Sequence, residues 1–97
     1  MSSKNYKLEN NRKRIDDLDE KILKLLNDRA RLSINIAQIK SSNNLPILSP
    51  ERENRLLEKI IAKNTGPFDS EAIQNIFNRI MDESKRLQNK ILDGNSK

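Results

Sequence analysis

The chain has 97 residues and a net charge of +5, and hydrophobic and charged residues each make up 34% of it. It contains neither cysteine nor histidine, which excludes a disulfide framework, Cys- or His-based metal sites and a Ser-His triad. No apolar stretch approaches the ~20 residues of a membrane span, and the first residues do not resemble a secretory signal. We therefore expect a single cytoplasmic domain over residues 1–97, with no Cys- or His-based metal site and no membrane contact.

Residues 8–41 are predicted to form one long helix. The segment between Lys7 and Ser41 has neither glycine nor proline, and residues that favour helix dominate it. Such a helix would be about 50 Å long. Its apolar residues recur at alternating steps of three and four, with Arg29 at the one missing position, and this heptad seam consists of Ile15, Leu18, Ile22, Leu25, Leu32, Ile36 and Ile39.

A second helix is predicted after a break at residues 43–46. Ser49 is expected to be its N-cap, and Pro50 suits the first turn, where a missing backbone N–H costs nothing. Apolar residues at positions 56, 57, 60 and 61 give this helix one hydrophobic stripe. The Asn64–Pro67 segment is expected to end it.

A third helix is predicted to follow, with Asp69 or Ser70 as its N-cap, and to reach about residue 92. A frayed polar tail is expected over residues 93–97. The fold class is therefore all-α, with three helices of unequal length and a core at about residues 8–92. A ~50 Å helix is too long for a globule whose radius of gyration should be near 13 Å. We expect a second copy of the chain to cover it, as an intertwined helical homodimer.

Three cations on the long helix are candidates for an anion site. Arg29 lies in the apolar seam, where it is either an anion ligand or a buried ion-pair or register residue. Lys40 follows ~16 Å along the helix and about 20° around it, so a small dianion can fit between the two, although Lys40 alone is more typical of a solvated cation. Arg12 lies ~42 Å from Lys40 and can contribute only to the partner's site in an antiparallel dimer, or is an ordinary surface cation.

Polar residues on the other two helices extend this set. Ser84 interrupts the seam of the third helix, and Gln88 lies one turn further on the same side. Arg52 and Glu53 lie in the first turn of the second helix, where helix-dipole complementarity and solvation would also explain them. A pocket of cations, one carboxylate, one amide and one hydroxyl suits a reaction that needs binding and electrostatics but no nucleophile.

Separated segments of the chain form a pattern with consistent spacing. They are Arg12-x-x-Ile15-x-x-Leu18-Asp19-x-x-Ile22-x-x-Leu25-Leu26-x-x-Arg29, Ile36-Ala37-x-Ile39-Lys40, Pro50-Glu51-Arg52-Glu53 and, in the third helix, Ser84 followed after three residues by Gln88. With this pattern, residues 10–91 resemble the all-helical class of chorismate mutases, which are small intertwined homodimers. The resemblance implies the rearrangement of chorismate to prephenate, for phenylalanine and tyrosine biosynthesis, without cofactor, metal or covalent intermediate.

The resemblance also implies how the two carboxylates of the substrate are bound. Arg29, together with Arg12 of the other chain, would bind them directly. Arg52 and Ser84 would support that binding.

For the reacting atoms, the resemblance implies that Lys40 and Gln88 donate hydrogen bonds to the ether oxygen. Glu53 would hold the hydroxyl of the ring. The chain has Ser49 where the family commonly has Asp; because the family uses mainly the backbone there, we expect this difference to be tolerated.

Three alternative functions compete with this one. Elimination of pyruvate from isochorismate could use the same scaffold and pocket. Residues 64–68 and 73–77 resemble the corresponding segments of mutase domains that are fused to other shikimate-pathway enzymes. The chain can therefore also be a regulatory domain, or act together with such an enzyme. Nucleic-acid binding is disfavoured, because the basic residues alternate with acidic ones and there is no aromatic platform.

Overall fold

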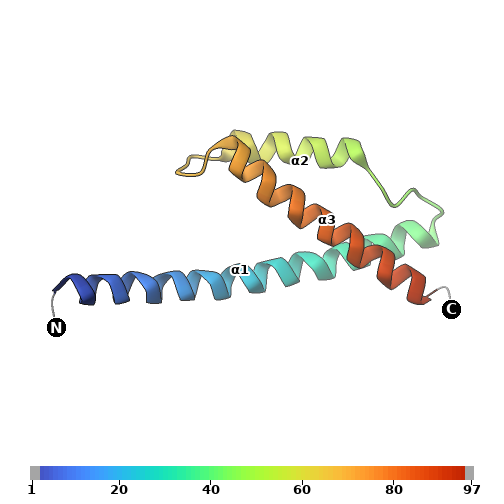
Figure 1. Ribbon diagram of the computed structural model, residues 1–97. Helices are drawn as coiled ribbons and strands as arrows, with labels where there is room; N and C mark the ends of the chain where they lie inside the picture. The colour runs from blue at the N-terminus through green and yellow to red at the C-terminus, as the bar shows by residue number, and fades with distance from the viewer. Residues whose placement is uncertain (1–2, 96–97) are drawn as a thin grey trace.

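The computed structural model describes residues 3–95, which form three α-helices and no strand. Helix α1 spans Ser3–Ser42, α2 spans Pro50–Lys63 and α3 spans Ser70–Asn95 (Figure 1). The predicted all-α class with one very long helix is thus confirmed. The described chain is elongated, with extents of 62 × 31 × 14 Å and a radius of gyration of 18.2 Å.

Two helix ends differ from the sequence-based expectation. Helix α1 begins at Ser3 rather than near residue 8, since nothing in its first residues breaks a helix. Helix α3 continues to Asn95, a few residues beyond the predicted end near residue 92. Residues 96 and 97 of the expected tail lie outside the described residues.

The connections between the helices are short and locally defined. After α1, Asn44 adopts a left-handed backbone with φ of 56°, and the Leu45 N–H donates to the Lys40 carbonyl at 2.8 Å. Ser49 occupies the N-cap position of α2, but its hydroxyl makes no capping hydrogen bond. Asp69 is the cap of α3, because its carboxylate accepts from the Ala72 N–H at 2.8 Å.

Helix α3 joins the other two helices. It crosses the C-terminal half of α1 and contacts α2 at an angle, whereas the N-terminal half of α1 extends away from both (Figure 1). Among the described residues only Ala37 on α1 and Met81 on α3 are buried.

The predicted seam of α1 is exposed in the single chain. Its seven apolar side chains are between 49% and 64% exposed, which is far too open for residues that drive folding. A second apolar surface lies between α1 and α3, around a cavity of about 500 Å³. Its apolar lining residues are Ile22, Leu26, Ala30, Ile76, Ile80 and Leu87. Exposed apolar surfaces of this size are typical of interaction sites.

Candidate active site

A pocket of about 300 Å³ lies where residues of all three helices and the loop after α1 come together. This volume is at the small end of the range for sites that bind small molecules. The pocket brings together seven of the eight residues that the sequence singled out: Arg29, Lys40, Ser49, Arg52, Glu53, Ser84 and Gln88.

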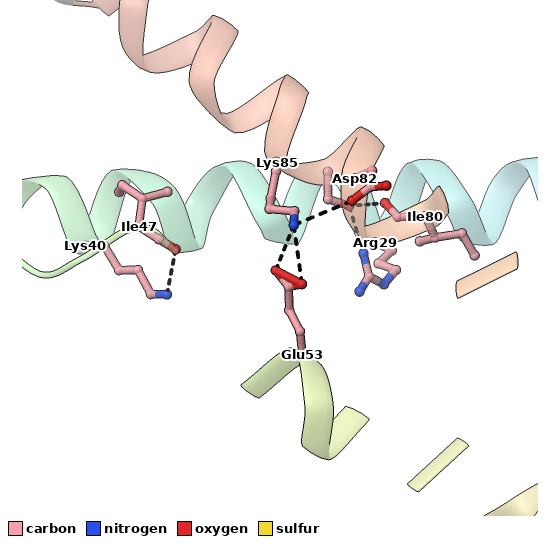
Figure 2. Close-up of polar contacts among 8 residues, drawn as sticks. Arg29, Lys40, Ile47, Glu53, Ile80, Asp82 and Lys85 are labelled. Carbon is pink, nitrogen blue, oxygen red and sulfur yellow. Dashed lines mark hydrogen bonds and ion pairs between the residues drawn. The ribbon is translucent and has the colours of Figure 1, made fainter. Parts of the chain in front are cut away.

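Arg29 is held by a neutral partner. Its Nη1 donates to the Ser84 hydroxyl on α3 at 2.8 Å, and that hydroxyl in turn donates to the Ile80 carbonyl at 2.9 Å (Figure 2). The guanidinium is therefore oriented without having its charge cancelled by this contact. The acid next to it in sequence, Asp28, accepts instead from Lys24 and Arg31, and these two hydrogen bonds lower its pKa. Asp28 is thus engaged elsewhere and does not form the ion pair considered for Arg29.

Lys40 lies at the other end of the pocket on α1. Its Nζ donates to the Ile47 carbonyl at 3.2 Å, in the loop between α1 and α2 (Figure 2). This bond uses one of the three donors of the ammonium group. The loop therefore fixes the direction of the lysine and keeps its positive charge at the pocket.

Gln88 reaches the pocket from α3. Its amide nitrogen donates to the backbone carbonyl of Ser33 on α1 at 2.8 Å. A primary amide has two N–H donors, so anchoring one of them directs the group and leaves the other for a ligand.

Glu53 is the only predicted acid of the site, and it has a partner that the sequence analysis did not name. Lys85 of α3 approaches its two carboxylate oxygens at 3.1 and 3.3 Å (Figure 2). The hydrogen bond to Glu53 raises the pKa of Lys85, so the lysine is charged at neutral pH. Glu53 and Lys85 are 32 positions apart on different helices, and no local spacing pattern links them.

Other pocket residues also escaped sequence reasoning. Ile47 and Ser33 contribute through backbone carbonyls, which any residue type provides. Ile36, Leu56 and Met81 form the apolar part of the pocket wall. In the sequence these residues are indistinguishable from ordinary core positions.

Arg12 is the one predicted site residue that lies outside the pocket. It is on the N-terminal half of α1, and its guanidinium pairs with Glu9 at 3.0 Å on an exposed surface. Because α1 is a continuous helix, Arg12 cannot reach the pocket of its own chain, as predicted.

The charge of the pocket is positive. Its lining includes Arg29, Lys40, Arg52 and Lys85 against the single carboxylate of Glu53. Among residues 3–95, no group of three or more acidic side chains is arranged to hold a metal ion. No helix in the same range is long and apolar enough to cross a bilayer. The arrangement suits a small organic anion that is held by charge and by fixed hydrogen-bond donors.

A comparison with known protein families identifies the family of the chain. Residues 11–89 match the family model described as chorismate mutase type II. The chain belongs to the chorismate mutase type II family. The match begins just before Arg12 and ends just after Gln88, so it includes every residue of the pattern described above.

Curated relatives of this chorismate mutase domain are of two kinds. It is 46% identical over 84 residues to the bifunctional chorismate mutase/prephenate dehydratase of Aquifex aeolicus, covering 82% of this chain and 23% of that protein. It is 36% identical over 89 residues to the chorismate mutase of Methanocaldococcus jannaschii, covering 90% and 89% of the two chains. The chain thus spans about a quarter of the bifunctional relative but most of the shorter one.

Solved structures of chorismate mutases have the same fold. A structure from Thermus thermophilus superposes with a TM-score of 0.84 at 34% identity, covering 86% of this chain and 94% of that one. The Helicobacter pylori enzyme, crystallised in complex with prephenate, gives a TM-score of 0.81 at 29% identity, covering 89% and 93%. These likenesses extend over all three helices and agree with the resemblance in the sequence pattern.

Proposed function

We propose that this protein is a chorismate mutase, which rearranges chorismate to prephenate in phenylalanine and tyrosine biosynthesis. The observation that carries the proposal is the pocket in which Arg29, Lys40, Glu53 and Gln88 converge within a domain of this family. The complex of the Helicobacter pylori relative with prephenate supports it. A pericyclic rearrangement needs no nucleophile, and the pocket lining has no histidine or cysteine to act as one.

Substrate binding is assigned to the cations. Arg29, oriented by Ser84, binds a carboxylate of chorismate, and Arg52 at the start of α2 adds to the positive charge. The backbone of Ser49 provides a further contact at the same wall of the pocket. Holding both carboxylates fixes the flexible enolpyruvyl arm over the ring, which lowers the entropic part of the barrier.

Acceleration of the chemical step is assigned to Lys40 and Gln88. As the ether C–O bond breaks and the new C–C bond forms, negative charge grows on the ether oxygen. An ammonium and an amide N–H aimed at that oxygen stabilise the transition state more than the ground state. Both groups are oriented in advance by backbone carbonyls, those of Ile47 and Ser33. Glu53 accepts from the ring hydroxyl and sets the orientation of the ring.

The active form is proposed to be an intertwined homodimer. The exposed seam of α1 and the apolar cavity between α1 and α3 are surfaces that a second copy would cover. In such a dimer the N-terminal half of α1 extends to the partner, where Arg12 supplies the second carboxylate ligand. The exposed Arg12–Glu9 pair is weak enough to be exchanged for a substrate carboxylate.

Fusion or association with another enzyme of the pathway is a second possibility, favoured by the bifunctional mutase/dehydratase relatives. We propose that the domain carries the same mutase activity in either setting and acts in the cytoplasm. The test is to add a prephenate dehydratase to the purified chain and to measure mutase turnover. Unchanged turnover is expected for an independent enzyme. A rise in turnover would instead indicate a domain that depends on a partner.

The deciding experiment is to follow the loss of chorismate absorbance with purified protein and to identify the product. Enzymatic loss of chorismate with prephenate as product is the expected result. Absence of turnover in a folded dimer would contradict the proposal. The alternative lyase activity is then assayed with isochorismate as substrate and pyruvate as the detected product.

A further inference from the structure

The ion pair between Lys85 and Glu53 connects two helices at the wall of the pocket. Lys85 is on α3 and Glu53 in the first turn of α2, and their side chains are only 32% and 29% exposed. The pairs Arg12–Glu9 and Arg86–Glu83, by contrast, lie within one helix and include more exposed cations. Figure 2 shows the lysine extended from α3 toward the carboxylate, between Arg29 and Lys40 in that view.

The geometry of Lys85 leaves it no obvious role as a direct ligand of a substrate. Its ammonium group lies 3.1 and 3.3 Å from the two oxygens of Glu53 and 3.5 Å from a carboxylate oxygen of Asp82. An ammonium has three N–H donors, and these three oxygens match them in number. A carboxylate, however, has about four lone-pair sites, so Glu53 keeps acceptor capacity for a hydroxyl group.

The negative charge of Glu53 is unfavourable for binding an anionic substrate, and Lys85 compensates it. The pocket is otherwise lined by cations, as expected for a substrate with two carboxylates, and an uncompensated carboxylate in it would repel that substrate. Without a partner the Glu53 side chain could also turn toward the nearby guanidinium groups and occupy a substrate subsite. A cation on the side of Glu53 that faces α3 counteracts both effects.

We propose that Lys85 is a positioning residue for the mutase reaction: it holds the Glu53 carboxylate against α3 with acceptor capacity toward the pocket, and it cancels the repulsion between Glu53 and the dianionic substrate. The inference rests on the function proposed above. It predicts a defect mainly in substrate binding, because the donors assigned to the ether oxygen are Lys40 and Gln88, whereas the ammonium of Lys85 is paired with carboxylates.

The test compares the steady-state kinetics of Lys85→Met, Lys85→Arg and Arg86→Met with those of the unmodified protein. Lys85→Met is expected to raise KM about tenfold and to lower kcat less than about threefold. Lys85→Arg keeps the positive charge and is expected to have a KM close to that of the unmodified protein. Arg86→Met removes the same charge from the adjacent position, where the side chain is 83% exposed and pairs with Glu83, and it is expected to leave both constants unchanged. If Lys85→Met does not fold, Lys85→Gln serves the same comparison.

A double-mutant cycle with Glu53→Gln isolates the pairwise effect. Once Glu53 is neutral, replacing Lys85 with Met is expected to change KM less than about twofold. An equal rise in KM in both backgrounds, or no rise in either, would overturn the role of Lys85. Chorismate turnover by the unmodified protein is measured first: its absence contradicts the proposed function itself, whereas turnover with a KM insensitive to Lys85 contradicts only this inference.

Discussion

The guanidinium of Arg29 donates to the hydroxyl of Ser84 over 2.8 Å and thereby connects α1 to α3 beside the pocket. The hydroxyl is itself fixed by its bond to the Ile80 carbonyl, so a chain of two hydrogen bonds sets the direction of the arginine. A partner of this kind restrains an arginine without neutralising it, which an ion pair cannot do.

Ser84→Ala is therefore expected to lower kcat/KM for chorismate about tenfold, because a hydrogen bond to a charged group contributes about 1.5–3 kcal/mol and part of the site remains solvated. Steady-state kinetics measure the effect, and Ser41→Ala on the exposed end of α1 is the matched control. Equal kcat/KM values for the two variants would show that Arg29 does not depend on Ser84.

Lys40→Ala is expected to reduce kcat by about 10²–10³-fold, as for loss of one preorganised group that stabilises a developing negative charge. Single-turnover measurements of chorismate loss separate this effect from product release. Lys59→Ala, an exposed lysine of α2, is expected to retain normal turnover. Near-normal turnover of Lys40→Ala itself would refute the assignment of Lys40 to the ether oxygen.

Gln88→Glu is expected to make catalysis favour acid pH. Only the protonated form of the new carboxyl can donate to the ether oxygen, so activity should fall about tenfold per pH unit above its pKa. The unmodified protein should show no such loss, because an amide does not titrate. A pH profile of kcat over about pH 4–8 checks this, and parallel profiles for the two proteins would argue against hydrogen-bond donation by Gln88.

Mixing Arg12→Ala and Arg29→Ala subunits tests the shared site. Each variant alone should be nearly inactive, because every site then lacks one carboxylate ligand. A mixed dimer contains one site with both arginines, so random exchange of equal amounts should restore about a quarter of normal activity. The activity is measured after unfolding and refolding the mixture. No recovery, with dimers present by sedimentation, would place Arg12 outside the partner's site.

The Lys85–Glu53 pair should contribute to stability in a pH-dependent way. The pKa of Lys85 is raised above its ordinary value of 10.5, so its contribution is complete below that pH and is lost as the pH rises through the higher, folded-state value. Thermal unfolding from about pH 8 to 12 should show the unmodified protein losing stability relative to Lys85→Arg, whose guanidinium stays charged. Parallel melting curves over this range would mean that Lys85 is not paired in the folded state.

The heptad pattern of α1 predicted the long helix and its exposed seam because a 3.5-residue repeat depends only on local spacing. Polar residues within apolar stripes, such as Arg29 and Ser84, likewise located the pocket, since a charge or a hydroxyl in a seam is expensive unless it has a partner or a function. The sequence did not indicate whether Asp69 or Ser70 caps α3, because Asp and Ser are both favourable N-cap residues.

The contacts between helices could not be derived from spacing. The pairing of Lys85 with Glu53 depends on where α3 contacts α2, and the roles of Ile47 and Ser33 depend on carbonyls that carry no side-chain signature. Such contacts depend on how α3 packs against α1 and α2. They require the three-dimensional arrangement rather than the residue pattern.

In the proposed homodimer, the projecting half of α1 makes the stability of the fold depend on the protein concentration. Most of the stability of a helix in a protein comes from the packing of its apolar face, so these residues gain their stability from the surface that covers them. When that surface is a second copy, folding and association are a single equilibrium governed by mass action. Each tenfold dilution then removes about 1.4 kcal/mol from the stability of the assembly, and the cellular level of the chain determines how much of it is folded.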